Sequence, residues 1–374
     1  MQQVRVLLVQ LASLGDCLFV TAIARQIKEI DFPGCHLTWI IGSKYKAAVE
    51  NNPYVDAVIE IPISSRNDIT TQRNLIKEHI ANAGGYNKFD QIFVTDYTEL
   101  NSKNWFGTTR SSLFRSYPHQ LKVNPQPLIY LTDGEKLSVE KFCRENKIDK
   151  FSYNVLFECS PQSGQSLMTF DKAKQLAAQI VSNHKNIKFI LSSNQPFTSD
   201  NSNIIDGSVI SWRENAELAN YCNLMMGCSS GISWLCTSQW TKPLPFIQIV
   251  NPMYMKGEFS ASMKIDFRYF GIDTKNLVEL YNPPEDILAE CIISASKNYF
   301  QIIKEKYDVT DNSYFSNYKF LNEARISFYE KIKLFIASLL SAFFINGFGR
   351  IKRGWVTRGA LWLKRKIFFH KKLF

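Results

Sequence analysis

The segment VRVLLVQLASLGDCLFVTAIA, residues 4–24, opens with an apolar run that only Arg5 and Gln10 interrupt. A short run of this kind, rich in β-branched residues, is typical of a strand that is buried on both faces. The small-residue turn 12–16 follows, and an apolar-periodic segment continues through Ile27. A strand, a glycine turn and a helix in this order predict the opening of a Rossmann-like unit, whose helix N-terminus favours anions.

The alternation of strand and helix continues along the chain and then starts again. We expect strands at 36–42, 56–62 and 88–95, with helices at 43–51, 64–83 and 132–147. A second series has strands at 153–159, 187–192, 204–210, 223–227 and 246–250, with helices at 169–183, 214–221 and 284–306. Such alternation favours parallel sheets, which bind ligands at the carboxyl ends of their strands. The chain is therefore predicted to be an α/β protein with domains at 1–150 and 151–310 and a tail at 311–374.

The composition is that of an ordinary globular protein, with 45% hydrophobic and 21% charged residues, and this excludes a wholly disordered chain. The eight cysteines form no CxxC pair and no Cys/His spacing suited to zinc, so we expect reduced thiols, no bound metal and no cofactor. Residues 1–3 lead into the first strand without the basic and apolar segments of a signal peptide. A cytoplasmic protein is therefore expected.

The opening segment belongs to a longer pattern: an LGD turn, a Thr-Ala pair, a Pro before a Trp-containing strand, and Asn-Pro-x-Val-Asp. The residues that form it are Leu14, Gly15, Asp16, Thr21, Ala22, Pro33, Trp39, Asn52, Pro53, Val55 and Asp56. This pattern resembles glycosyltransferase family 9, the heptosyltransferase-like family. The resemblance implies a GT-B fold, in which two Rossmann-like domains face each other across a cleft. It also implies that Asp16 is the catalytic base, whereas the residues alone favour a helix cap at Asp16.

A second match lies at the predicted strand-to-helix turn Ser229-Ser230-Gly231. Ser230 and Gly231 match a Ser/Thr-Gly pair that meets the donor diphosphate in the family, although the family has Asp at Ser229 and His at Trp234. Independently of the resemblance, such a turn offers N–H groups, hydroxyls and the positive end of a helix, while an ordinary Ser N-cap explains it equally well. Glu217 matches the acidic position that the family uses near the nucleoside.

The turn 160–166 contains no Lys or Arg, whereas the family has a basic residue after the corresponding strand. We expect Ser163, Gly164 and Gln165 to bind the donor diphosphate through neutral donors, which bind more weakly than charged ones. Arg213, just before the helix predicted at 214–221, is a candidate for neutralising a phosphate, with a surface charge as the alternative. These departures from the family pattern put heptose in doubt as the transferred sugar.

Residues 96–120 form a long polar and aromatic segment, which we interpret as a loop on the acceptor side. Long loops in α/β domains are usually functional. We assign Gly15, Asp96, Arg110 and Arg115 to this acceptor side. For Asp96, a cap at the end of a strand is an equally good explanation.

These features predict a glycosyltransferase that moves a sugar from a nucleoside-diphosphate sugar to a hydroxyl of a bacterial surface glycan or glycolipid, as in lipopolysaccharide synthesis. Asp16 takes the acceptor proton during an inverting attack. The 229–231 turn stabilises the departing diphosphate and replaces a metal, since no DxD-type pair stands in the expected cleft. The alternatives are a non-catalytic nucleotide-sugar or glycan-binding protein, and a nucleotide-sugar epimerase or hydrolase on the same fold.

The net charge of +10 belongs to the C-terminal tail. Eleven Lys and Arg residues and no Asp or Glu lie in 331–374, so the rest of the chain is nearly neutral. The apolar stretch 334–345 is shorter than the ~20 residues that span a bilayer. Because basic residues then alternate with aromatic and aliphatic ones, we expect 331–374 to lie on the anionic inner face of the plasma membrane. Single-stranded nucleic acid and a partner helix are the alternatives, and the high apolar share disfavours nucleic acid.

Truncation after Asp311 should release a two-domain protein that still binds nucleotide, while the full chain should bind anionic vesicles and bind neutral ones weakly. High salt should displace part of the bound protein, because the Debye length shrinks from about 10 Å at 0.1 M to about 3 Å at 1 M. Vesicle co-sedimentation measures both effects. Equal binding to neutral and anionic vesicles would contradict the electrostatic contribution, and tight binding to RNA alone would assign the tail to nucleic acid.

Overall fold

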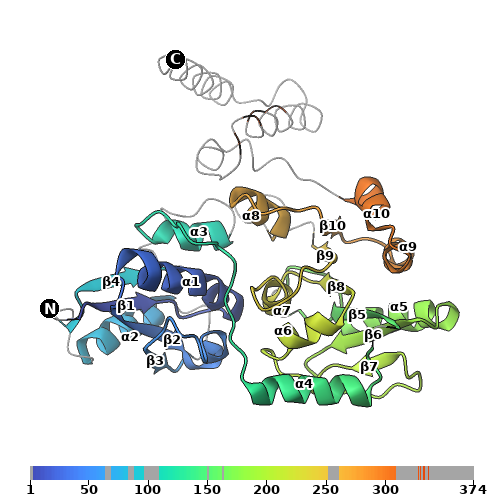
Figure 1. Ribbon diagram of the computed structural model, residues 1–374, viewed down its shortest axis with the longest axis horizontal. Helices are drawn as coiled ribbons and strands as arrows, with labels where there is room; N and C mark the ends of the chain where they lie inside the picture. The colour runs from blue at the N-terminus through green and yellow to red at the C-terminus, as the bar shows by residue number, and fades with distance from the viewer. Residues whose placement is uncertain are drawn as a thin grey trace. The chain divides into compact units, whose positions relative to one another are not determined.

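The computed structural model describes residues 3–63, 69–82, 88–96, 109–149, 151–161, 164–251 and 261–308, with single positions at 327, 329, 332 and 336. The chain divides into two compact units, Met1–Met263 with Lys275–Val309, and Lys264–Thr274 with Thr310–Phe374. The first unit holds both sheets (Figure 1). No helix among the described residues is long and apolar enough to cross a membrane. All basic residues of the tail lie outside the described residues, so its amphipathic helix stays a prediction.

The first sheet has four parallel strands in the order β3-β2-β1-β4. The strands are β1 (Arg5–Val9), β2 (His36–Gly42), β3 (Ala57–Ile61) and β4 (Gln91–Val94). They are connected by α1 (Leu14–Gln26), the π-helix η1 (Ile27–Asp31), the 3₁₀-helix η2 (Ser43–Ala48) and α2 (Ile69–Asn82), and α3 (Thr109–Ser116) follows β4. Figure 1 shows α1 and α2 on opposite faces of this sheet.

The two-sided cover of β1 explains why its sequence is a continuous apolar run. Leu7 and Val9 belong to one core cluster with Ile76 and Ile80 of α2. Because side chains alternate along a strand, Leu8 points to the other face, and it is also fully buried. A polar side chain on either face of β1 would have to give up its contacts with water, so both faces are apolar.

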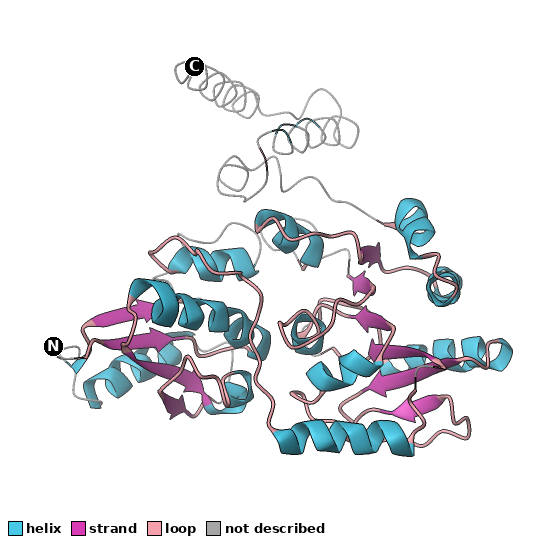
Figure 2. Ribbon diagram, viewed as in Figure 1, coloured by secondary structure: helices cyan, strands magenta, loops and turns pink. Residues whose placement is uncertain are grey.

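The second sheet has six parallel strands in the order β10-β9-β8-β5-β6-β7 (Figure 2). They are β5 (Tyr153–Glu158), β6 (Ile187–Ser192), β7 (Ile204–Asp206), β8 (Leu224–Gly227), β9 (Phe246–Val250) and β10 (Leu277–Tyr281). The helices are α4 (Asp133–Glu145), α5 (Phe170–Asn183), α6 (Asn215–Leu218), η5 (Ala219–Tyr221), α7 (Gly231–Leu235), α8 (Met263–Tyr269), α9 (Glu285–Ser296) and α10 (Phe300–Tyr307). The core joins Val155 and Phe157 of β5 with Leu176 of α5 and Ile292 of α9.

Several elements differ from the prediction. The strand β10 is not predicted, because Glu279 interrupts its apolar run; the structure buries this carboxylate and gives it a hydrogen bond from Ser262 Oγ at 2.6 Å. The helix predicted at 284–306 is two helices, separated near Asn298, whose φ of 64° is the left-handed conformation in which helices end. The interpretation of 96–120 as a loop is wrong for Thr109–Ser116, which is helix α3.

Each sheet has one point at which the direction of strand addition reverses. The chain passes from β1 to β2 and β3 and then places β4 on the other side of β1. It does the same around β5, with β6 and β7 on one side and β8, β9 and β10 on the other. In open α/β sheets ligands bind outside the carboxyl ends of the strands at such a switch point. The described residues at these points are 10–13 after β1 and, in the second sheet, 159–161 and 164–169 after β5 and 228–230 after β8.

Candidate functional site

Two glycine turns, one from each sheet, meet at the switch points. A Cβ atom on Gly15 would lie 3.8 Å from the Cα atom of Gly231, and a Cβ atom on Gly231 would lie 4.0 Å from the backbone nitrogen of Gly15. Two indoles flank this contact: the added atom on Gly15 would lie 3.6 Å from Cδ1 of Trp234, and that on Gly231 only 3.0 Å from Nε1 of Trp212. The two backbones are therefore close neighbours, and the position where a side chain would be most crowded is Gly231, because of the Trp212 indole.

Asp16 is the third residue of α1 and is 6% exposed. The backbone N–H and the hydroxyl of Ser13 both donate to Asp16 Oδ2, at 3.0 and 2.9 Å. This arrangement is a capping box in which Ser13 is the N-cap residue, so the alternative assignment of Asp16 as the N-cap is wrong. The role of its carboxylate as a base stays a prediction.

Asp96, just after β4, ties the ends of two strands together. The backbone N–H of Leu11 donates to Asp96 Oδ2 at 2.7 Å. Burial raises the pKa of the Cys17 thiol well above its ordinary value, and the negative charges of Asp16 and Asp96 raise it further. Both predicted carboxylates are therefore close enough to this thiol to influence its pKa.

Arg110, on α3, is fully buried and lies against two adjacent aromatic rings. Its Cζ atom lies 4.0 Å from the ring centroid of Phe19 and 4.3 Å from that of Trp234. A desolvated cation over an aromatic face gains about 2 kcal/mol. Because Trp234 also contacts Gly15, Arg110 is separated from the glycine turns by one indole. Arg115 is five positions further along α3, about 140° around the helix, and points in a different direction.

Glu158, which was not among the predicted site residues, ends β5 and accepts hydrogen bonds from the turn after β8. The backbone N–H of Cys228 donates to Glu158 Oε2 at 3.0 Å, and the hydroxyl of Ser233 donates to the same oxygen. Burial raises the pKa of Glu158, and the hydrogen bonds from Ser233, Cys228 and Ser230 oppose this rise only in part. Part of the donor capacity assigned to a diphosphate is thus already used by an internal carboxyl group. A charged residue in an apolar strand, at a switch point, is the signal that could have found it.

The three residues of the Ser229-Ser230-Gly231 turn differ in what they can offer a ligand. Ser229 is buried, has a φ of 57°, and donates its hydroxyl to the carbonyl of Ala261 at 2.9 Å. Ser230 is the N-cap residue of α7 and makes no side-chain capping bond, which differs from the alternative of an ordinary Ser cap. Ser230 and Gly231 are both partly exposed.

Of the second predicted diphosphate turn, Gly164 and Gln165 are described and Ser163 lies outside the described residues. Asn251, at the end of β9, donates its backbone N–H to the carbonyl of Gln165 at 2.8 Å and its side-chain amide to the carbonyl of Gly164 at 3.4 Å. The turn is therefore anchored at the carboxyl edge of the second sheet.

Glu217, predicted near the nucleoside, lies on α6 and is partly buried. Its Oε2 atom accepts hydrogen bonds from Trp240 Nε1 at 2.7 Å and from Asn220 Nδ2 at 3.3 Å. The carboxylate thus orients the Trp240 indole, and its contact with a nucleoside stays a prediction.

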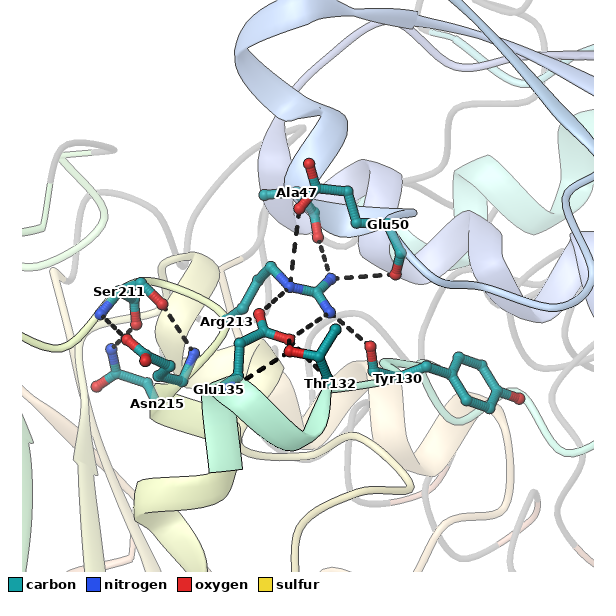
Figure 3. Close-up of polar contacts among 9 residues, drawn as sticks. Ala47, Glu50, Tyr130, Thr132, Glu135, Ser211, Arg213 and Asn215 are labelled. Carbon is teal, nitrogen blue, oxygen red and sulfur yellow. Dashed lines mark hydrogen bonds and ion pairs between the residues drawn. The ribbon is translucent and has the colours of Figure 1, made fainter. Parts of the chain in front are cut away.

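Arg213 is neither a surface charge nor a phosphate ligand, so both predictions for it are wrong. The residue is 5% exposed, and each of its five donors has an acceptor (Figure 3). Nε donates to Glu135 Oε1 at 2.5 Å, and Nη2 donates to Glu135 Oε2 at 3.4 Å and to the carbonyl of Tyr130 at 2.5 Å. Nη1 donates to the carbonyls of Ala47 at 2.8 Å and Glu50 at 3.2 Å. Arg213 therefore joins the segment before α6 to the end of η2, which connects two strands of the first sheet, and to the start of α4.

All eight cysteines are free and buried. Burial raises the pKa of the Cys143, Cys159 and Cys291 thiols to about 12, so these side chains are poor nucleophiles at neutral pH. The described residues hold no group of three His, Cys, Asp or Glu side chains that could bind a metal ion.

No family model and no curated protein matches the chain. Among solved structures it is similar to a glycosyltransferase family 9 protein from Veillonella parvula, with 16% identity and a TM-score of 0.53 over 90% of this chain and 97% of that one. It is also similar to the ADP-heptose lipopolysaccharide heptosyltransferase II of E. coli, with 11% identity and a TM-score of 0.52 over 79% of this chain and 99% of that one. The fold is GT-B. The predicted fold class is thereby confirmed, and at these identities the likeness is one of fold.

Glu158→Gln should reduce the pH dependence of stability. A carboxyl group with a raised folded-state pKa holds its proton more tightly when folded, so its contribution to the free energy of unfolding falls as pH rises above the ordinary value of 4.5. The wild type should therefore lose stability relative to the variant as pH rises, measured by urea unfolding between pH 4 and 8. A constant difference across this range would contradict the raised pKa.

Proposed function

We propose that this chain is a glycosyltransferase that moves a sugar from a nucleoside-diphosphate sugar to a hydroxyl of a bacterial surface glycan or glycolipid of the lipopolysaccharide kind. One observation carries the proposal: within a GT-B fold, the Gly15 and Gly231 turns meet at the switch points of the two sheets. Each turn begins a helix, and each has a carboxyl group beside it. We assign the protein to the cytoplasm, held at the inner membrane face by residues 331–374.

In this proposal Asp16 is the general base. The acceptor hydroxyl attacks the anomeric carbon, its proton passes to the Asp16 carboxylate, and the bond from that carbon to the diphosphate oxygen breaks with inversion. The two hydrogen bonds from Ser13 hold one carboxylate oxygen in place, which supports this role because a base must be oriented before it can take a proton. Gly15, Asp96 and Arg110 are assigned to the acceptor side, while Arg115 lies on another face of α3.

The donor side is formed by the second sheet. Ser230 and Gly231 face the diphosphate, with Ser229 supporting the turn from inside. The turn of Ser163, Gly164 and Gln165 is the second contact with the diphosphate, and Glu217 lies near the nucleoside. Neutral donors and backbone N–H groups stabilise the leaving diphosphate electrostatically, without metal or cofactor.

Asp16→Asn should lower turnover by at least ~10²-fold while leaving nucleotide binding intact, since it removes the base and keeps a hydrogen-bond acceptor for Ser13. Release of nucleoside diphosphate from a panel of donor sugars, with and without glycolipid acceptor, measures turnover. Thr169→Ala is the matched control, because it removes the side-chain cap of α5 and costs about 1 kcal/mol of stability without touching the base.

Near-normal turnover in Asp16→Asn would show that the carboxylate of Asp16 serves only the capping box with Ser13. Wild-type binding of a nucleoside diphosphate without any turnover would favour the non-catalytic binding protein. Donor breakdown that is independent of an acceptor would favour the hydrolase or the epimerase.

Gly231→Val should weaken nucleoside-diphosphate binding, because the added side chain would press on Trp212 Nε1, which lies 3.0 Å from the position of its Cβ atom. Isothermal titration measures the affinity. Gly134→Val is the control: Gly134 is exposed on α4, and a Cβ atom there meets only Thr132 Oγ1, at an ordinary 3.8 Å. Unchanged affinity in Gly231→Val would move the donor site elsewhere, first to the turn containing Gly164.

A further inference from the structure

Arg213 and Glu135, which form an ion pair, each lie in a short turn that is closed by two reciprocal hydrogen bonds (Figure 3). Thr132 donates its backbone N–H to Glu135 Oε2 at 2.7 Å and accepts from the Glu135 backbone N–H at 3.2 Å. Ser211 and Glu214 repeat this pattern, at 2.8 Å from Ser211 N to Glu214 Oε2 and 3.2 Å from Glu214 N to Ser211 Oγ. Both sequences have the S/T-x-x-E spacing of a capping box. The guanidinium and its carboxylate are therefore both preorganised.

The remaining partners of Arg213 explain why this residue is an arginine. Ala47 is near the end of η2 and Glu50 is two residues past it, where carbonyl groups lack N–H donors from a following turn of helix and carry partial negative charge. The carbonyl of Tyr130 belongs to the segment that leads into α4. The planar guanidinium donates to all these acceptors at once with its five N–H groups, whereas the ammonium group of a lysine has only three, all on one nitrogen. We call Arg213, Glu135 and the carbonyls of Ala47, Glu50 and Tyr130 the Arg213 latch.

The turn that carries the latch also carries a contact to the donor side. Trp212 precedes Arg213, and its Nε1 atom would lie 3.0 Å from a Cβ atom on Gly231. Nε1 is buried and has no hydrogen-bond partner, so its position is set by packing against Gly231 and by the fixed turn from Ser211 to Glu214. One short turn thus contacts the first half of the chain through Arg213 and the Gly231 turn through Trp212.

We propose that the turn from Ser211 to Glu214 couples two places: the contact of Arg213 with the end of η2, which joins the part of the chain with the first sheet to the part with the second, and the donor site at the Gly231 turn. Arg213 is a positioning residue: it touches no substrate, and it holds the second half against η2 so that Trp212 keeps the Gly231 turn in contact with Gly15. Loss of the Arg213 hydrogen bonds makes both the contact with η2 and the Gly231 turn more mobile. The consequence for donor binding rests on the proposed function, and the mechanical coupling does not.

The coupling is tested on the full chain by hydrogen exchange and small-angle scattering of Arg213→Met. We expect a larger radius of gyration and faster amide exchange both in 43–50, at the latch, and in 227–236, which holds the Gly231 turn. Arg213→Lys should give smaller changes of the same kind, because lysine keeps the positive charge but has three hydrogen-bond donors in place of five. Trp212→Ala should speed exchange in 227–236 and leave 43–50 and the radius of gyration unchanged.

Lys28→Met is the matched control. It removes a hydrogen-bonded ion pair with Asp56 at 2.7 Å and a bond to the carbonyl of Cys35 at 2.8 Å, all within the first half of the chain. This variant should lower stability without changing exchange in 227–236. If Arg213→Met speeds exchange in 43–50 alone, or changes 227–236 no more than Lys28→Met does, the coupling is wrong. If Arg213→Met fails to fold, Arg213→Lys and Trp212→Ala still decide the question through the same two segments.

Nucleotide affinity then tests the functional consequence separately. Arg213→Met should weaken nucleoside-diphosphate binding roughly tenfold, within the 5- to 150-fold range that coupling between sites typically gives. If Arg213→Met changes exchange in 227–236 but leaves the nucleoside-diphosphate affinity unchanged, the mechanical coupling is supported and its effect on donor binding is overturned. A wild-type chain that binds no nucleoside diphosphate would overturn the proposed function, while the exchange data would still judge the coupling.

Discussion

The contact between the Gly15 and Gly231 backbones constrains the chemistry of everything around it. Each glycine lies in the first turn of a helix, so two positive helix ends point into one small region, and their partial charges repel each other. Each end has its own carboxyl group: Asp16 bonds to the N-cap residue of α1, and Glu158 accepts from the turn that begins α7. A carboxyl group therefore accepts hydrogen bonds beside each of the two helix ends.

The same region also holds a buried cation. The guanidinium of Arg110 lies against Phe19 and Trp234, which pack edge to face with their ring centroids 4.8 Å apart. Where the resembling family has an imidazole that accepts or donates hydrogen bonds, this chain has an indole that stacks on a charge. The positive group near the glycine turns therefore comes from the first half of the chain, through α3.

The fold could be predicted from the sequence because its signals are local. Continuous apolar runs mark the buried strands, and the Leu-Gly-Asp turn after β1 stands directly beside the strand it follows. The residues that the prediction lacked depend on distant partners. Glu158 meets Cys228 and Ser233, more than 69 positions away along the chain, and no local pattern links them. Arg213 was a candidate residue, but its partners lie in two distant segments, 47–50 and 130–135, so the sequence favoured a surface charge, with a phosphate contact as the alternative.

The latch also fixes an order of events during synthesis. Arg213 is 166 positions beyond Ala47, whose carbonyl it binds. At about 5–20 residues per second, a ribosome needs roughly ten to thirty seconds to add that length of chain. During this time the first four strands are complete, while the carbonyls at the end of η2 have only water as a partner. The contacts of Arg213 with Ala47 and Glu50 can therefore form only after this interval.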